Sequence, residues 1–218
     1  MPIKAVIFDL GETLICEDQI WAGWADYLGV SVNEFRSALD DIIARGEHHR
    51  KVFDRFRPHF DFEAARRDRL SRGDNHVFTV DDLYPDACAC LRALRTNGYR
   101  VGIAGNQPIE AERAIGELGL DVDFIASSAG LGIEKPAPQF FSKIAQLAEA
   151  PPAEIAYIGD RIDNDVVPSR HAGMVSVFLE RGPWGRIHAK RDDVRLADIW
   201  IKDLLELPTA LATFSRKE

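Results

Sequence analysis

Four short polar segments carry residue types that could work together in one reaction. They hold carboxylates, a lysine and amide-rich turns: residues 9–13 (DLGET), 105–108 (GNQP), 134–136 (EKP) and 159–165 (GDRIDND). Clustered carboxylates repel one another unless some are protonated or a cation neutralises them. Oxygen-rich sites suit Mg2+. If folding brings these segments together, they predict a magnesium-assisted reaction.

The reaction that this set of groups favours is phosphoryl transfer. A carboxylate beside Mg2+ and a lysine can attack a phosphoryl group, because the cations screen the repulsion between the two anions. The turn at Gly105 leads into a predicted helix, where backbone N–H groups can hold phosphate oxygens. The segments therefore predict phosphoryl chemistry through a covalent aspartyl intermediate.

The elements between these segments alternate between two patterns. Short apolar runs suit strands buried in a parallel sheet: Ile3–Phe8, Arg100–Ala104, Phe124–Ser127, Ile155–Ile158, Val175–Phe178 and a shorter Ile199–Ile201. Helical patterns separate or follow them: Pro85–Thr96, Ile109–Leu118, Pro138–Glu149, Asp165–Ala172 and Asp203–Thr213. This alternation predicts a three-layer α/β fold with a doubly wound parallel sheet, in which ligands bind beyond the carboxyl ends of the strands.

One long connection interrupts this alternation of strands and helices. About 70 residues separate the first predicted strand from the next helix, from Ile15 to Tyr84. A structureless loop of that length is unusual in a compact domain, and apolar spacings from Leu28 to Ile43 fit an amphipathic helix. We therefore expect a helical subdomain at residues 15–82, inserted into a core made of residues 1–14 and 83–218.

The order and spacing of the four segments resemble the motifs of the haloacid dehalogenase superfamily. The matching stretches are VIFDLGETL, GIAGNQP, GIEKPAPQFF and YIGDRIDNDVVPSRHAGM. The resemblance covers nearly the whole chain, and the insert is similar to that of the subclass with a helical cap. It implies a Rossmann-like core and a Mg2+-dependent phosphatase that acts on a small phosphorylated metabolite, with the cap selecting the substrate.

The resemblance also implies roles for individual residues. Asp9 would be the nucleophile and a metal ligand. The backbone carbonyl of Gly11 and the side chains of Asp160 and Asp165 would complete the protein's share of the metal site. Lys135 would bridge the nucleophile and the phosphoryl group.

Two positions depart from the pattern of the family's phosphatases. These enzymes usually carry a second aspartate two residues after the nucleophile, as a general acid and base, and here that position is Gly11. Such assistance is worth about 10²–10⁴-fold, and Glu12 is the nearest spare carboxyl. A Thr or Ser is expected at Gly105, where Asn106 could donate to the phosphate instead. Gly105, Asn106 and Lys135 form the predicted phosphate-binding set.

These departures leave several functions open. One is a slow or specialised phosphatase, and another is a degenerate protein that binds a phosphorylated ligand or a partner. A third is phosphonate hydrolysis with Lys51 as a Schiff base, since Lys51 is the one lysine in residues 14–80. Metal-free dehalogenation is disfavoured, because Asp160 and Asp165 would then remain uncompensated.

Charge is unevenly distributed along the chain. The net charge is -8, which does not suit a nucleic-acid binder. Residues 45–72 nevertheless carry nine Lys/Arg against five Asp/Glu, which fits either a solvated helical face or a lid over an anionic substrate. The candidate lid contacts are His48, His49, Arg50 and Lys51. Trp21 and Trp24 could stack on a ligand or pack the subdomain's core.

The remaining composition indicates a cytoplasmic protein. The three cysteines are too few for a disulfide framework and are expected to be reduced thiols. No stretch approaches the roughly 18 apolar residues of a membrane span, and the N-terminus lacks the features of a signal peptide. We expect a small-molecule partner rather than a membrane or a nucleic acid, and the sequence leaves the oligomeric state open.

Overall fold

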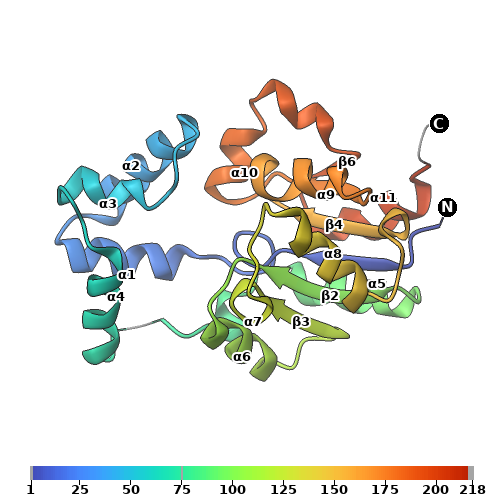
Figure 1. The fold of residues 1–218 in the computed structure, drawn as a ribbon, viewed down its shortest axis with the longest axis horizontal. Helices are drawn as coiled ribbons and strands as arrows, with labels where there is room; N and C mark the ends of the chain where they lie inside the picture. Colours follow the sequence, from blue (N-terminus) through green and yellow to red (C-terminus); the bar gives the residue numbers. More distant parts are fainter. Residues whose placement is uncertain (1, 75, 216–218) are drawn as a thin grey trace. The chain divides into compact units, whose positions relative to one another are not determined.

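The larger part of the chain is built around one parallel sheet (Figure 1). The computed structural model describes residues 2–74 and 76–215. The strands are β1 (Ala5–Phe8), β2 (Arg100–Gly105), β3 (Phe124–Ser127), β4 (Ile155–Gly159), β5 (Val175–Leu179) and β6 (Ile199–Ile201). They are ordered β3-β2-β1-β4-β5-β6, and all neighbours are parallel. This confirms the predicted α/β fold with a doubly wound sheet.

The register of the three central strands decides where the polar segments meet. Phe8 of β1 is level with Ile103 of β2 and with Ile158 of β4. The residues that follow these positions therefore leave the sheet at the same edge. Strand order reverses direction between β1 and β4, which is where ligands bind in such sheets.

Helices flank the sheet, and most of them bury apolar side chains. They are α5 (Ala87–Thr96), α6 (Ile109–Glu117), α7 (Ser128–Leu131), α8 (Pro138–Leu147), α9 (Val167–His171), α10 (Gly182–His188) and α11 (Leu207–Thr213). Short 3-10 turns lie at Val80–Asp82, Pro152–Glu154, Asp192–Leu196 and Leu204–Glu206. On α8, Phe140, Phe141 and Ile144 are fully buried against strand residues, each contributing about 1.5–3 kcal/mol.

The helix expected at Asp165–Ala172 has a different start. Residues Ile162–Val166 form a π-helical turn, and α9 begins only at Val167. In the wider turn, the backbone N–H groups of Asp165 and Val166 both donate to the carbonyl of Arg161. Single π turns are frequent at functional sites, and this one follows Asp160 directly.

Residues 17–77 form a second compact unit, separate from the sheet-containing unit of residues 1–16 and 78–218. Its helices are α1 (Asp18–Leu28), α2 (Val32–Ala44), α3 (Lys51–Phe56) and α4 (Phe62–Ser71). Ser31 and Glu34 form a capping box at the start of α2. That this helical unit acts as a substrate-selecting cap stays a prediction.

An aromatic cluster fills the helical unit. Trp24 lies 5.0 Å from Phe53 and 4.9 Å from Phe62 between ring centres, and Trp21 stacks on Phe35 at 6.0 Å. Both tryptophans are buried. Their packing role is therefore the one that the structure supports. Among the described residues, no helix is long and apolar enough to cross a membrane.

Candidate active site

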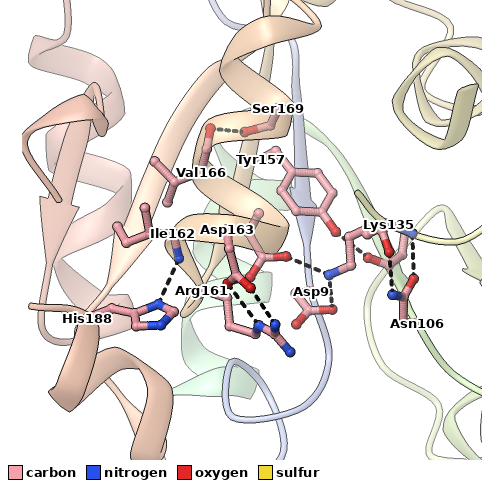
Figure 2. A network of polar contacts seen from close by, with 12 residues as sticks. Asp9, Asn106, Lys135, Tyr157, Arg161, Ile162, Asp163, Val166, Ser169 and His188 are labelled. Atoms are coloured by element: carbon pink, nitrogen blue, oxygen red, sulfur yellow. Dashed lines mark hydrogen bonds and ion pairs between the residues drawn. The ribbon is translucent and has the colours of Figure 1, made fainter. Parts of the chain in front are cut away.

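Three carboxylates meet at the edge of the sheet where β1 and β4 end. Asp9, Asp160 and Asp165 each offer an oxygen within 4.8 Å of the others, and all three residues are buried. The Nζ atom of Lys135 lies 2.7 Å from Asp9 Oδ1 and 2.6 Å from Asp165 Oδ1. Figure 2 shows the lysine reaching to the carboxylate of Asp9. Four residues spread over more than 150 positions are thus assembled into one polar centre.

The charges in this centre do not balance. Burial, and then the charges of Asp165, Asp9 and Glu12, raise the pKa of Asp160 well above its usual value. Burial opposes the charged form of Lys135, but the neighbouring Asp165 and Asp9 raise its pKa overall. Ionised, the three carboxylates leave two negative charges uncompensated by the single ammonium.

One of these buried oxygens also lacks a hydrogen-bond partner. Within the described residues, Oδ2 of Asp160 is buried and accepts no hydrogen bond. Buried polar atoms are normally satisfied. A divalent cation would satisfy this oxygen and offset the surplus charge, so the donor set fits Mg2+. The Gly11 carbonyl stays a predicted ligand.

Two glycines leave room for these carboxylates. A Cβ atom at Gly105 would lie 2.4 Å from Asp9 Oδ1, and one at Gly159 would lie 2.3 Å from Asp165 Cγ. Both distances are well below van der Waals contact. The glycine at position 105 therefore has a second effect besides the loss of a hydroxyl. It leaves space for the Asp9 carboxylate, which a larger residue would displace.

The side-chain amide of Asn106 binds the backbone of Lys135. Its Oδ1 accepts the backbone N–H of Lys135 at 2.7 Å, and its Nδ2 donates to the Lys135 carbonyl at 2.9 Å. The amide thus holds the backbone of the lysine that joins the carboxylates (Figure 2). Donation to phosphate, which we expected of Asn106, stays a prediction for the second N–H of the amide.

The loop after Asp9 is fixed by a pair that sequence reasoning missed. Glu12 adopts a left-handed backbone conformation, with φ 54°. Its Oε2 accepts a hydrogen bond of 2.6 Å from the hydroxyl of Tyr84, and its side chain lies over Gly182, where a Cβ would be 2.6 Å away. Positive φ is uncommon for a residue other than glycine. Only the spare carboxyl of Glu12 was visible in the sequence, since its two partners are far away along the chain.

The π-helical turn is held from α10. Nδ1 of His188 accepts the backbone N–H of Ile162 at 3.0 Å, and His188 is buried. Burial lowers the pKa of His188 to about 4, so the ring is neutral at physiological pH. Asp163 lies outside the three-carboxylate group and pairs with Arg161.

The four predicted lid contacts lie in the helical unit. Arg50 forms an ion pair of 3.3 Å with Glu63, and Lys51 forms one of 3.1 Å with Glu47. The rings of His48 and His49 stack at 4.4 Å. Each charge thus has a partner within its own unit, and contact of these residues with a substrate stays a prediction.

Comparison with known proteins places the chain in a family. A model of haloacid dehalogenase-like hydrolases matches residues 3–173, so the chain belongs to this hydrolase family, as its motifs predicted. A glyceraldehyde 3-phosphate phosphatase of Methanopyrus kandleri is 32% identical over 113 residues, which are 50% of this chain and 48% of the relative.

Two further relatives match along nearly their full lengths. A Pyrococcus furiosus protein of the same name is 25% identical over 99% of this chain and 94% of its own. The crystal structure of a 2-haloacid dehalogenase from Pseudomonas syringae covers 98% of this chain and 100% of that one, with 26% identity and a TM-score of 0.60. The relatives thus include both phosphatases and a dehalogenase.

Proposed function

We propose that this protein hydrolyses phosphate monoesters of small metabolites through a phosphorylated Asp9. The observation that carries the proposal is the buried group of Asp9, Asp160 and Asp165 around Lys135, with one Asp160 oxygen unsatisfied. Several curated relatives are named as phosphatases of glyceraldehyde 3-phosphate, and one as a phosphoserine phosphatase. Both names describe small phosphorylated compounds.

Asp9, Asp160 and Asp165, with the Gly11 carbonyl, would hold Mg2+. When bound, the ion would offset the negative charge of the carboxylates and of the phosphoryl oxygens. Lys135 holds Asp9 and Asp165 in place through its two short hydrogen bonds. The positive charge of the same ammonium would attract a phosphoryl oxygen.

In the first step, a carboxylate oxygen of Asp9 forms a bond to phosphorus while the bond from phosphorus to the ester oxygen breaks. The ester oxygen keeps the electron pair and takes up a proton. In the second step, a water oxygen attacks phosphorus, the acyl-phosphate bond breaks, and inorganic phosphate and free Asp9 are formed. Each proton transfer needs an acid or base, and Gly11 supplies no side chain for it.

Two contacts restrict the side chain of Glu12 and make it a poor substitute for the missing acid. Its Oε2 already accepts the hydrogen bond from Tyr84, and its side chain is packed over Gly182. We therefore propose that the enzyme is best suited to esters whose alcohols leave readily, because such leaving groups depend least on protonation.

The surplus of carboxylates favours this function over dehalogenation. In a metal-free site, the single ammonium of Lys135 would face three carboxyl groups, and some of these would have to stay protonated to avoid uncompensated buried charges. Phosphonate hydrolysis through Lys51 receives no support from the ion pair of Lys51 with Glu47. A phosphate-binding protein without turnover is the remaining alternative.

A single screen separates these functions. Phosphate monoesters, phosphonoacetaldehyde and 2-chloropropionate are offered with Mg2+ and with chelator, and phosphate or chloride release is measured; phosphonoacetaldehyde carries the carbonyl that a Schiff base with Lys51 requires. We expect phosphate release that requires Mg2+ and is lost in Asp9→Asn. Chloride release in the presence of chelator would contradict the proposal, as would the absence of phosphate release from every ester.

A further inference from the structure

Arg161 is a cation beside the site that the proposed reaction does not use. It follows Asp160 directly, and its backbone N–H donates to Asp165 Oδ2 at 3.0 Å. Its guanidinium donates from Nε and Nη2 to the two oxygens of Asp163, at 3.2 and 2.7 Å. The guanidinium carbon also lies 5.2 Å from the ring centre of Trp184. These contacts hold the guanidinium in a defined position before any ligand arrives.

The charge of Arg161 acts on the carboxylates of the site. Burial alone would lower its pKa, but the hydrogen bond to Asp163 and the charges of Asp163, Asp165 and Asp160 raise it. Arg161 follows Asp160 directly and its backbone N–H binds Asp165, so its charge is placed beside both carboxylates. Because β1 and β4 are parallel neighbours, Arg161 and Asp9 emerge at the same edge of the sheet, as Figure 2 shows.

This guanidinium still has donors to offer. An arginine carries five N–H groups, and Asp163 accepts from only two of its nitrogens. Within residues 2–74 and 76–215, no other residue accepts a hydrogen bond from the Arg161 side chain, and Nη1 has no acceptor. The side chain is 25% exposed, so a ligand can reach it.

An arginine–aspartate pair with the same local geometry also occurs away from the site, so this geometry alone does not define a binding site. Arg191 donates to both oxygens of Asp193, at 2.9 and 2.6 Å, with the same spacing of two residues. Its side chain is 41% exposed, and its electrostatic partners are Asp193 and Asp163 rather than the three site carboxylates. Two features distinguish Arg161 from Arg191. Arg161 follows Asp160 directly, and its guanidinium lies over the ring of Trp184.

We propose that Arg161 binds a second anionic group of the substrate, so that the preferred substrates are small phosphate monoesters that also carry a carboxylate. This rests on the proposed phosphatase function. A guanidinium presents parallel N–H donors that match a carboxylate. Nη1 and the unused N–H of Nη2 can supply such a pair of donors beside the site. Arg161 also acts as a specificity residue against neutral esters of the same size.

Binding of two phosphonates tests this proposal without turnover. Calorimetry with Mg2+ present compares phosphonoacetate, which has a carboxylate, with ethylphosphonate, which has none. A hydrogen bond to a charged group is worth about 1.5–3 kcal/mol, so we expect the wild type to prefer phosphonoacetate by about tenfold or more. Arg161→Gln should reduce the preference to about twofold or less, whereas the control Arg191→Gln should keep it.

Two results would overturn the proposal. One is equal binding of both phosphonates by the wild type, and the other is an unchanged preference in Arg161→Gln. If Arg161→Gln does not fold, Arg161→Lys replaces it. That variant keeps the charge and loses the parallel donors, so the preference should fall by at least about threefold, and an unchanged preference in it would likewise overturn the proposal.

Turnover separates this proposal from the proposed function. The ratio of kcat/KM for 2-phosphoglycolate and ethyl phosphate should follow the binding preference in the wild type and in Arg161→Gln. Arg161-dependent binding of phosphonoacetate without hydrolysis of any ester, aryl phosphates included, would support the role of Arg161 and contradict the phosphatase. Equal hydrolysis of both esters, unaffected by Arg161→Gln, would support the phosphatase and overturn the role of Arg161.

Discussion

The side-chain amide of Asn106 bonds both backbone groups of Lys135, 29 residues further along the chain. It accepts the N–H and donates to the carbonyl of the same residue, so the lysine backbone is held on two sides. The turn after β2 is thereby joined to the segment that carries the site's ammonium group. The position of Nζ between Asp9 and Asp165 depends on this backbone being fixed.

Replacing Asn106 should therefore affect both catalysis and stability. In Asn106→Asp, the donor to the Lys135 carbonyl becomes an acceptor, which leaves that carbonyl facing a negative charge. We expect a loss of about 1–3 kcal/mol in the free energy of unfolding and a fall in kcat of about tenfold or more. Urea denaturation and phosphate release measure the two effects. Asn97→Asp, at the exposed C-terminal end of α5, should cost less than about 1 kcal/mol and leave kcat unchanged. Full activity in Asn106→Asp would refute the positioning role.

Tyr84 should stabilise the loop after the nucleophile. Burial and the charge of Glu12 raise the pKa of Tyr84, so its hydroxyl remains a donor at all ordinary pH values. Tyr84→Phe leaves the buried Glu12 carboxylate without this hydrogen bond, and we expect a loss of about 1–3 kcal/mol of stability at pH 7. Urea denaturation checks this, with Tyr99→Phe as the control. A variant as stable as the wild type would show that the pair does not hold the loop.

The stability of the protein should decrease in acid because of His188. An unfolded histidine takes up a proton near pH 6.5, but the pKa of folded His188 is lowered to about 4 by burial. The unfolded state therefore binds more protons between these values, and stability falls as pH drops from about 6.5 towards 4.

The variant His188→Asn isolates this contribution. Asparagine keeps an acceptor for the N–H of Ile162 but does not titrate. Urea denaturation from pH 7 to pH 4 measures the free energy of unfolding of both proteins. As the pH falls, the wild type should lose more of this free energy than the variant. A difference that stays constant over this range would contradict the assignment.

Gly11→Asp should supply the acid that the loop lacks. The left-handed conformation in this loop falls at Glu12, and we expect an aspartate at position 11 to be tolerated. We expect kcat to rise for alkyl phosphates, whose leaving groups need protonation, and to change little for aryl phosphates. Equal effects on both classes would show that proton transfer to the leaving group is not the deficit. Adding Gly105→Thr should not help, since its Cβ would meet the Asp9 carboxylate.

The fold and the meeting of the charged residues were predictable because they follow from local patterns. Short apolar runs such as Ile155–Ile158 define buried strands, and parallel strands bring their carboxyl ends to one edge. Asp9, Lys135 and Asp160 could therefore be expected at one place.

The hydrogen bonds that fix this centre were not predictable. Tyr84 and Glu12 are 72 residues apart, and nothing in the spacing of either residue indicates the other. The π-helical start at Ile162 was missed for a similar reason, since His188 on a distant helix holds it. The two hydrogen bonds of Asn106 to the Lys135 backbone likewise carry no sequence signal, whereas its donation to phosphate stays a prediction.

The central claim is that Asp9 becomes phosphorylated, and chemical trapping tests it most directly. The protein is mixed with Mg2+ and a phosphate monoester that it hydrolyses, quenched in acid and treated with borohydride, which reduces an aspartyl phosphate to homoserine. Peptide mass spectrometry should then find homoserine at position 9 and at no other aspartate, and none without substrate. Turnover of the ester with no modification of Asp9, or with trapping at Asp160 or Asp165 instead, would contradict the account.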